Sequence, residues 1–401
     1  MKIKVLVADK FPDLYLEKIK NLDCDVINEP KIKAEELAGK INDIDILIVR
    51  STEVHEDCIQ KSNKLSLIIR AGAGVNNINI KAANKKGIYV ANCPGKNSIA
   101  VAELAMGLIC AIDRRIPDNV IDFRNGKWNK GTYSKAEGLF GKTLGVVGTG
   151  QIGTELIGRA QSFGLNIICW SRSLTDKKAE ELGVKRCSTL EELFSSADIV
   201  SVHLAQTAET KKIISKDLLN KLKKGAIFIN TARAGVVDEE ALLSLIKEEK
   251  IFAGLDVFSS EPEAKEGNFT SELCRLKNVY VTHHIGASTE QAQNAVAEET
   301  VNIISDYKNL GVVRNWVNRC AKTAAKYQLV VRHYDKPGVL SKVLGLLSSE
   351  KINAQEIENV IFDGELTACC TIKLDSSPSE KSLKEIEANE DDIINISLIE
   401  L

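Results

Sequence analysis

Three short segments carry side chains that could together oxidise an alcohol. Arg233 stands in NTARAG, Glu261 ends the run that begins at Asp256, and His284 stands in THHIG. An arginine can grip a carboxylate through two parallel hydrogen bonds, and a histidine can move a hydroxyl proton. A glutamate beside that histidine would fix its tautomer and raise its pKa. We therefore expect oxidation of a 2-hydroxy acid, although each such residue alone is more often a surface or capping group.

The adjacent His283 and His284 raise the alternative of a metal site. Consecutive residues on an extended strand point to opposite faces, so the two imidazoles could hardly bind one ion together. The ten cysteines form no CxxC pair, and none stands near a histidine at the spacing of metal ligands. The sequence predicts no metal site, one catalytic histidine, and the reduced thiols of a cytoplasmic protein.

A glycine-rich motif, GTGQIG, follows an apolar run and opens a helical pattern. Glycine at the first position permits a tight turn, at the second lets the backbone approach a pyrophosphate, and at the third lets helix and strand pack closely. The phosphates would lie at the helix N-terminus. We expect the motif to bind a dinucleotide, with contacts from Gly148, Gly150, Gln151, Ile152 and Gly153.

The adenosine ribose should lie near Ser171 and Arg172, at the end of the next strand. Sites that select NAD carry a carboxylate there, and none is present. Arg172 could pair with the 2′-phosphate of NADP, or it could lie beside adenine or face water. NAD is the expected cofactor, with NADP left open. Further cofactor contacts are expected at other strand ends, from Thr231, Ala232 and Asp256.

A second group of cations stands in the first hundred residues. Arg50 and Ser51 follow one apolar run, and Arg70 follows another and leads into AGAGV. The carboxyl ends of parallel strands border the ligand crevice. Two guanidinium groups, a hydroxyl and the backbone amides at Ala73 and Gly74 could bind a phosphate together with a carboxylate. The alternative is that both arginines are solvated or ion-paired.

The apolar pattern supplies a scaffold for these residues. Short β-branched runs alternate with helical patterns, which predicts parallel sheets flanked by helices. The fold class is therefore α/β, with two doubly wound domains, one flavodoxin-like and one Rossmann-like. The expected strands are 3–8, 44–49, 66–69 and 88–90 in the first sheet, and 142–148, 166–170, 198–203, 226–230, 252–257 and 279–282 in the second.

Two expected long helices, one starting at Ser98 and one over 287–307, connect the domains. We predict a substrate-binding domain over 1–96 and 286–318 and a dinucleotide-binding domain over 97–285. The tail reads strand, helix, strand, strand, helix, strand, with a hairpin at Asp363-Gly364. That order predicts a ferredoxin-like βαββαβ module over 327–401.

Composition narrows the classes of partner. The 401 residues carry 53 basic and 55 acidic side chains, a formal charge of −2, which argues against a nucleic-acid partner. No segment approaches the roughly 20 apolar residues of a membrane span, and the N-terminus does not resemble a signal peptide. Residues 327–401 hold 7 basic and 14 acidic residues. That tail is therefore −7 and the remainder +5, and the remainder contains the arginines expected to bind anions.

The motifs GTGQIG, NTARAG, DVFSSEP and HIGAST resemble those of the D-isomer-specific 2-hydroxyacid dehydrogenases. Within that family the chain is most similar to the D-3-phosphoglycerate dehydrogenases that end in an ACT domain. The resemblance covers essentially the whole length and implies that Arg233, Glu261 and His284 are catalytic. It also implies that Asn97 contacts substrate or cofactor. His283 stands where the family commonly has proline, and Ser171 where it normally has aspartate.

For the tail, the resemblance implies an ACT domain that regulates the enzyme. In related enzymes the positions of His333, Asp335 and Asn353 contact serine, although Asp335 stands where asparagine is common. An ACT fold that serves assembly alone is the alternative. The resemblance also implies a homodimer or homotetramer, with the region around Trp128 and the helix before it forming the dimer contact.

The implied reaction is the oxidation of 3-phospho-D-glycerate to 3-phosphohydroxypyruvate, the first step of serine synthesis. Two alternatives stay open at the level of the sequence. One is a glyoxylate or hydroxypyruvate reductase of the same superfamily, which Ser171 and Arg172 would favour. The other is a dinucleotide-sensing scaffold of the same fold, since such proteins can retain the catalytic residues.

Overall fold

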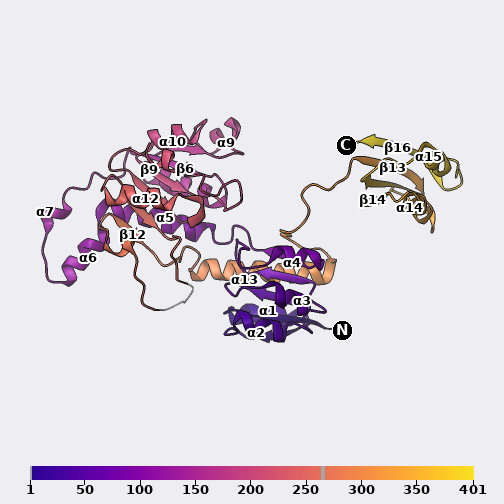
Figure 1. Ribbon diagram of the computed structural model, residues 1–401, viewed down its shortest axis with the longest axis horizontal. Helices are drawn as coiled ribbons and strands as arrows, with labels where there is room; N and C mark the ends of the chain where they lie inside the picture. Colours follow the sequence, from indigo (N-terminus) through magenta and orange to yellow (C-terminus); the bar gives the residue numbers. More distant parts are fainter. Residues whose placement is uncertain (1, 263–266) are drawn as a thin grey trace. The chain divides into compact units, whose positions relative to one another are not determined.

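Two parallel sheets and one antiparallel sheet form the fold (Figure 1). The structure is a computed structural model that describes residues 2–262 and 267–401. Backbone contacts divide the chain into two units, Met1–Asn318 with both parallel sheets and Arg319–Leu401 with the antiparallel one. These sheets confirm the predicted fold class.

The first sheet has the strand order β2-β1-β3-β4-β5. Its central strands β3 and β4 are short apolar runs that are buried on both faces, as parallel strands usually are. The prediction lacked β2, the edge strand. The elements are β1 (Ile3–Val7), β2 (Cys24–Asn28), β3 (Ile46–Val49), β4 (Leu67–Arg70) and β5 (Tyr89–Asn92), with α1 (Asp13–Asn21), α2 (Ala34–Lys40), α3 (Glu56–Lys61) and α4 (Ile80–Lys85).

The second sheet has the order β12-β11-β10-β9-β6-β7-β8. The order reverses between β6 and β9, and such a switch point opens a ligand crevice at the carboxyl ends of the strands. The strands are β6 (Thr143–Val147), β7 (Asn166–Trp170), β8 (Lys185–Arg186), β9 (Ile199–Val202), β10 (Ile227–Asn230), β11 (Phe252–Leu255) and β12 (Val279–Val281).

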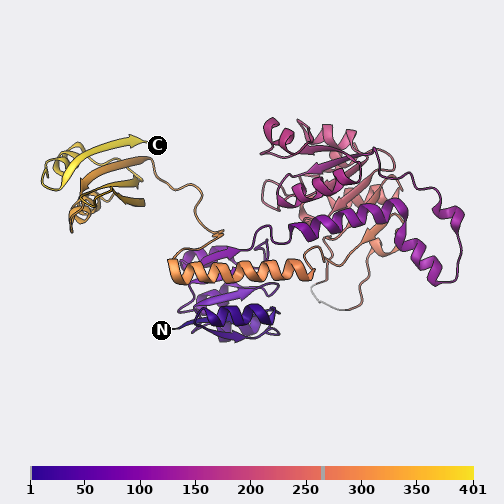
Figure 2. The same cartoon turned by 180° about the vertical axis from the view of Figure 1, so that it is seen from behind.

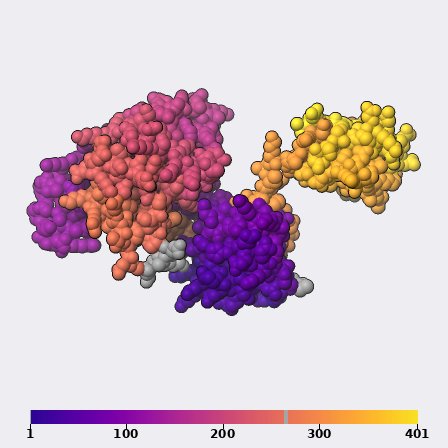
Figure 3. Space-filling view, viewed as in Figure 1, coloured from indigo at the N-terminus to yellow at the C-terminus, as the bar shows by residue number. Residues whose placement is uncertain are grey.

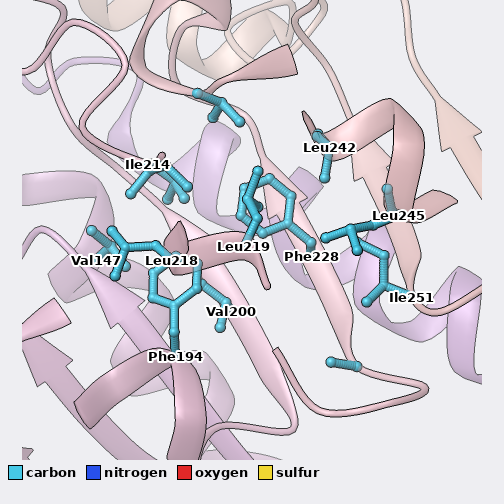
Figure 4. Close-up of a cluster of buried hydrophobic side chains, with 14 of the residues drawn as sticks. Val147, Phe194, Val200, Ile214, Leu218, Leu219, Phe228, Leu242, Leu245 and Ile251 are labelled. Atoms are coloured by element: carbon cyan, nitrogen blue, oxygen red, sulfur yellow. The ribbon is translucent and has the colours of Figure 1, made fainter. Parts of the chain in front are cut away.

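Helices cover both faces of the second sheet. Phe194, Leu218 and Leu245 pack with Phe228 of β10 on one face (Figure 4), and α5 and α8 pack on the other. The helices are α5 (Ser98–Arg114), α8 (Gln151–Ser162), α9 (Asp176–Glu181), α10 (Leu190–Ser196), α11 (Lys216–Leu219) and α12 (Glu239–Lys247), with 3₁₀ turns η1 (Ala234–Val236) and η2 (Glu272–Arg275).

The long helix α13 (Glu290–Leu310) returns to the first sheet. Thr289 caps its start by accepting a hydrogen bond from the Ala292 N–H at 3.1 Å, and Gly311 ends it in the left-handed region. Ala297, Val301 and Ile304 pack into the core formed by β1, β3 and β4, and both ribbon views show the helix along that layer (Figures 1 and 2).

A projecting segment follows α5. It consists of α6 (Ile116–Arg124) and α7 (Lys130–Tyr133), neither of which has a buried residue. In the space-filling view its purple atoms lie at the left edge of the molecule (Figure 3). Ile121, Phe123 and Trp128 are largely exposed there. Isolated helices as short as these are marginal in water, and these apolar side chains have little cover from the described part of the chain.

The second unit has the predicted element order. Its sheet has the strand order β14-β15-β13-β16, and every pair is antiparallel. Leu329, Cys370 and Leu347 belong to its core, which the two helices cover. The elements are β13 (Tyr327–Tyr334), α14 (Val339–Ser349), β14 (Ala354–Ile361), β15 (Thr367–Leu374), α15 (Glu380–Glu387) and β16 (Ile393–Glu400).

Candidate active site

His284 and Glu261 form a hydrogen-bonded pair at the carboxyl edge of the second sheet. His284 Nδ1 lies 2.7 Å from Glu261 Oε2, and Glu261 Oε1 accepts the Phe258 N–H at 2.9 Å. Because the carboxylate can only accept, Nδ1 carries the proton of this bond. The ring is thereby held in one tautomer, and its Nε2 is left for a ligand.

The pair shifts both pKa values away from their usual ranges. The hydrogen bond that His284 donates to Glu261 raises the pKa of His284, although burial opposes this shift. Burial acts to raise the pKa of Glu261, but the bonds from His284 and the Phe258 N–H outweigh burial and lower it. The carboxylate stays ionised, and the imidazole can exchange a proton near neutral pH.

The loop that carries His284 is held by Asp256, a carboxylate that is only 1% exposed. Its Oδ1 accepts from the Thr282 hydroxyl at 2.6 Å and the Ile285 N–H at 2.9 Å, and its Oδ2 accepts from the Gly286 N–H at 2.8 Å. His284 has a φ of 51°, a conformation that costs roughly 1 kcal/mol for a residue other than glycine. Asp256 therefore supports a strained backbone at the candidate catalytic residue.

Arg233 follows β10 and is fixed by Asn230. The Asn230 side chain accepts the Ala232 N–H at 3.0 Å and donates to the Arg233 carbonyl at 3.1 Å. The guanidinium donates from Nη1 to the Ala232 carbonyl at 2.6 Å and lies against Gly74, where a Cβ would come within 2.6 Å of Nη2. Burial lowers the pKa of Arg233, and Glu261 partly offsets this.

A cleft of about 1210 Å³ joins the ends of both parallel sheets. Of the catalytic and substrate-binding residues predicted from the sequence, those that line it are Arg50, Ser51, Arg70, Gly74, Asn97, Arg233, Glu261 and His284. Ala73 belongs to the same loop, where its carbonyl accepts from the Asn92 side chain. His283 also lines the cleft, beside His284. The chain thus gathers residues separated by more than 200 positions.

Arg70 is a buried cation in this cleft whose side chain has an unused hydrogen-bond donor. Its Nε is buried and has no hydrogen-bond partner in the described part of the chain. Burial lowers its pKa to about 10, and the charges of Arg233 and Arg50 add to the effect. Three neighbouring cations repel one another, and a bound anion would relieve both the repulsion and the unmade bond.

The glycine motif lies at the switch point and fits a dinucleotide. A Cβ on Gly153 would lie 2.0 Å from the Gly148 carbonyl oxygen, and Gly148 has a φ of 98°. A Cβ on Gly150 would meet nothing within 4 Å, so this glycine leaves open space before the N-terminus of α8. Gly150 caps α8 without a side-chain bond, and Gln151 and Ile152 form the first turn. The first N–H groups of a helix have no partner within the helix, and such groups suit a pyrophosphate.

Other predicted cofactor residues follow strands β10 and β7 of the same sheet. Thr231 Oγ1 is buried without a partner among the described residues, and Ala232 is buried beside it. Ser171 and Arg172 follow β7, and Arg172 is exposed. His203, after β9, was not predicted: its Nδ1 has no described partner, and burial lowers its pKa to about 4. These unmade bonds fit a polar ligand, as an NAD(P) ribose or nicotinamide would be.

The sequence reasoning also missed the residues that hold the loops. Asp9 accepts three backbone N–H groups after β3, and Asn230 fixes the Arg233 turn. A short polar residue at the end of a buried strand, or within two residues of that end, was the available signal. Among the described residues, no group of three or more His, Cys, Asp or Glu could hold a metal ion. Every helix in residues 2–262 and 267–401 is also too short or too polar to cross a membrane.

The predicted regulatory residues lie in the second unit. His333 is 2% exposed, its Nδ1 lies 2.8 Å from the Tyr334 carbonyl oxygen, and its Nε2 lies 3.1 Å from Asn359 Oδ1. Asp335 follows β13 directly, whereas Asn353 precedes β14 at the opposite end of the sheet. One copy of the module therefore does not bring His333 and Asn353 together.

Comparison with known proteins agrees with this geometry. The family model "D-isomer specific 2-hydroxyacid dehydrogenase, NAD binding domain" matches residues 106–286, which identifies the dinucleotide as NAD(P). The chain is 42% identical to a D-3-phosphoglycerate dehydrogenase of Methanocaldococcus jannaschii over 312 residues, which are 75% of this chain and 57% of that protein. It thus spans little more than half the length of that relative.

Two further similarities cover most of the other protein. A hydroxypyruvate reductase of Thermotoga maritima is 41% identical over 288 residues, 71% of this chain and 91% of that enzyme. The NAD⁺-bound 3-phosphoglycerate dehydrogenase of Entamoeba histolytica aligns with a TM-score of 0.65 and 29% identity, over 80% of this chain and 99% of that one. The chain belongs to the family of D-isomer-specific 2-hydroxyacid dehydrogenases.

Proposed function

We propose that the chain oxidises 3-phospho-D-glycerate to 3-phosphohydroxypyruvate with NAD(P), the first step of L-serine biosynthesis. The observation that carries this proposal is the group of Arg50, Arg70 and Arg233 in the cleft that also contains His284. One arginine would suffice for a carboxylate. Three arginines, one of them without a described partner at its buried Nε, suit a substrate with a second anionic group.

The side chains divide the reaction between them. Arg233 grips the carboxylate and polarises the oxygen on C2, while Arg50, Ser51 and Arg70 hold the phosphate. His284 takes the hydroxyl proton at Nε2 as the C2–H bond breaks, and Glu261 stabilises the resulting imidazolium. A bound nicotinamide would supply the acceptor for the hydride that leaves C2 as the C2 carbonyl forms. In reduction, His284 returns its proton to the oxygen.

A substrate panel tests the proposal. We expect 3-phosphoglycerate to be oxidised with a higher kcat/KM than D-glycerate, because only the former fills the phosphate site. Arg50→Ala should raise KM for 3-phosphoglycerate roughly tenfold or more and leave KM for D-glycerate nearly unchanged. Equal effects on both substrates would remove the phosphate assignment.

A glyoxylate or hydroxypyruvate reductase is the second candidate. Ser171 and Arg172 favour it, because no carboxylate there opposes the 2′-phosphate of NADPH. The similarity to the hydroxypyruvate reductase of T. maritima also supports it. Rapid reduction of hydroxypyruvate and glyoxylate with NADPH, together with no oxidation of 3-phosphoglycerate, would favour this candidate. A several-hundredfold preference for NAD(H) would count against it.

The same panel addresses a scaffold that binds the dinucleotide without catalysis. An active chain that loses turnover on His284→Asn is an enzyme, since the mutation removes the proton acceptor and leaves the glycine motif intact. A chain that binds NAD(H), as seen by quenching of its fluorescence, yet converts none of these substrates would be the scaffold.

We further propose that the second unit is an ACT domain that binds an amino acid such as serine at an interface between two copies. The separation of His333 from Asn353 within one module supports the need for a second copy. A titration with L-serine, with and without residues 319–401, tests this. Inhibition in the full chain alone supports regulation, whereas no inhibition leaves assembly as the role. The cytoplasm is the proposed location, because all ten cysteines are free.

A further inference from the structure

A buried carboxylate at the end of β1 gathers the loop that follows β3. Asp9 Oδ2 accepts the N–H groups of Arg50, Ser51 and Thr52 at 2.7, 2.9 and 2.9 Å. The Thr52 hydroxyl adds a bond to the Ala8 carbonyl at 3.1 Å. Asp9 is 6% exposed. A buried carboxylate with three N–H donors forms short, charge-assisted bonds, so the loop has little freedom to adopt another conformation.

This conformation decides which groups the loop presents to a ligand. Three consecutive N–H groups that point to one spot would by themselves form an anion site. Asp9 already occupies that spot, so the loop can meet a ligand only with its side chains. Arg50 and Ser51 both line the cleft, and the Arg50 guanidinium has no hydrogen bond or ion pair among the described residues.

The second sheet contains the same device. Asp256 follows β11 and accepts N–H groups of the loop after its neighbour β12, just as Asp9 follows β1 and holds the loop after its neighbour β3. The loop held by Asp256 carries His284, and the loop held by Asp9 carries Arg50. Each carboxylate therefore holds a loop that carries a residue of the cleft. We infer that both have the same role, which is to fix the conformation of a loop that faces the ligand.

We propose that Asp9 is a positioning residue that sets the preference for a phosphorylated 2-hydroxy acid by holding Arg50 and Ser51 toward the phosphate. This inference rests on the proposed function, because it assumes that the phosphate lies beside the loop. Asp9 itself makes no contact with the substrate in this assignment.

The sign of the effect separates positioning from simple electrostatics. Asp9 carries a negative charge at the wall of a cleft that takes an anion. If the charge acted only through space, Asp9→Asn would remove a repulsion and lower KM for the phosphorylated substrate. If Asp9 positions the loop, the same mutation weakens three charge-assisted bonds and raises KM.

The experiment compares KM and kcat for 3-phosphoglycerate and D-glycerate in Asp9→Asn, Arg50→Ala and the double mutant. We expect Asp9→Asn to raise KM for 3-phosphoglycerate about fivefold or more, with kcat and KM for D-glycerate within about twofold. The double mutant should raise KM by less than the product of the two single effects, because Asp9 acts mainly through Arg50 and in part through Ser51. Asp9→Ala should raise KM for 3-phosphoglycerate more than Asp9→Asn does, because asparagine keeps an acceptor oxygen. If the alanine variant does not fold, the asparagine variant still decides.

Asp45→Asn is the matched control. Asp45 precedes β3 in the same sheet and accepts the Lys4 N–H at 2.8 Å, at the end of the strands away from the cleft. It should leave both KM values unchanged. The proposal is overturned if Asp9→Asn lowers or does not change KM for 3-phosphoglycerate. An equal rise for both substrates, or multiplying effects of the Asp9 and Arg50 mutations, would overturn it as well.

Inorganic phosphate separates this inference from the proposed function. Phosphate should raise the Tm of the full chain more than chloride at equal ionic strength, and less so in Asp9→Asn than in Asp45→Asn. If that pattern holds while 3-phosphoglycerate is not oxidised, the inference survives and the proposed substrate fails. If 3-phosphoglycerate is oxidised but neither KM nor the phosphate effect depends on Asp9, the inference alone fails.

Discussion

At the scale of single residues, the site uses its buried acids on the backbone and leaves its cations for ligands. The carboxylate oxygens of Asp256 and Asp9 accept hydrogen bonds largely from backbone N–H groups, while Arg70 keeps an unpartnered Nε in the described structure. Glu261 is the exception, since it pairs with His284. Such a division fixes the geometry before binding, so that little reorganisation is needed when the anionic substrate arrives.

The Glu261–His284 pair makes the pH profile a direct test of its role. Oxidation needs neutral His284, so kcat/KM should fall as the pH drops through the raised pKa of His284. Glu261→Gln removes the negative charge and weakens the hydrogen bond that together raise this pKa, and the acid limb of the profile should therefore move to lower pH. Because the ring also loses its fixed tautomer, kcat should fall roughly 100-fold. The measurement is kcat/KM for oxidation between pH 5 and 9, a range spanning the usual histidine pKa of about 6.5.

Glu272→Gln is a suitable control for that profile. Glu272 forms an exposed ion pair with Lys247, and its loss should change neither the limb nor kcat. An acid limb that stays in place in Glu261→Gln would show that another group sets it. A limb that moves to higher pH would contradict the assigned cause of the shift.

Sequence patterns anticipated side chains better than their supports. Arg233, Glu261 and His284 were expected together because each follows a strand of one parallel sheet, and the cleft contains all three. The partners of Asp256 could not be predicted, because they depend on how the loop after β12 folds back. The buried, unpartnered Nε of Arg70 could not be predicted either, because the burial of an atom depends on how the whole chain packs.

At the scale of elements, the turn from β6 into α8 offers a contrast between two glycines. A Cβ on Gly153 would lie 2.0 Å from the Gly148 oxygen, so Gly153→Ala should destabilise the fold by about 1 to 3 kcal/mol. A Cβ on Gly150 meets nothing within 4 Å, so Gly150→Ala should change the free energy of unfolding by less than about 0.5 kcal/mol. It should nevertheless weaken NAD(H) binding severalfold, because the methyl group enters the pyrophosphate space.

Denaturant unfolding without cofactor and fluorescence titration with NADH measure the two effects separately. Gly158→Ala serves as the control, because it lies on the same helix and a Cβ there also meets nothing within 4 Å. Gly158→Ala should leave the NADH affinity unchanged and should not lower the free energy of unfolding. Unchanged NADH affinity in Gly150→Ala would show that the pyrophosphate does not approach this residue.

The elements that sequence patterns missed share a physical reason. β2 lies at a sheet edge, contains Asp25 and ends in Asn28, and buries only Cys24, so its apolar signal is weak. β8 has two exposed residues. α6 begins at Ile116 with a proline in its first turn and buries nothing within the chain. Apolar sequence patterns predict an element through its buried residues, and these three elements have few buried residues.

At the scale of the whole molecule, we propose that a second copy binds over the exposed apolar side chains of α6. Ile121 is 55% exposed and Phe123 is 68% exposed. We expect the wild-type chain to form a homodimer or homotetramer, and the pair Ile121→Asp and Phe123→Asp to shift it toward a smaller species, since charge in an apolar interface is costly. Light scattering after size exclusion measures the mass. The same substitutions at the exposed Leu14 and Phe163 are controls, and dissociation by them instead would place the contact elsewhere.

The two units of the chain should be separable by truncation. The core of residues up to Asn318 and the core of Arg319–Leu401 consist of different residues, and each sheet is complete within its own unit. A chain that ends at Asn318 keeps the cleft, the glycine motif and His284. We therefore expect it to fold, to unfold with a Tm close to that of the corresponding transition in the full chain, and to retain kcat within about threefold, since no cleft residue is removed. Thermal unfolding and turnover of both proteins make the comparison. Loss of activity with an unchanged fold would mean that the second unit contributes to catalysis through assembly. Loss of folding would mean that the first unit depends on the second for its stability, although the two have separate cores.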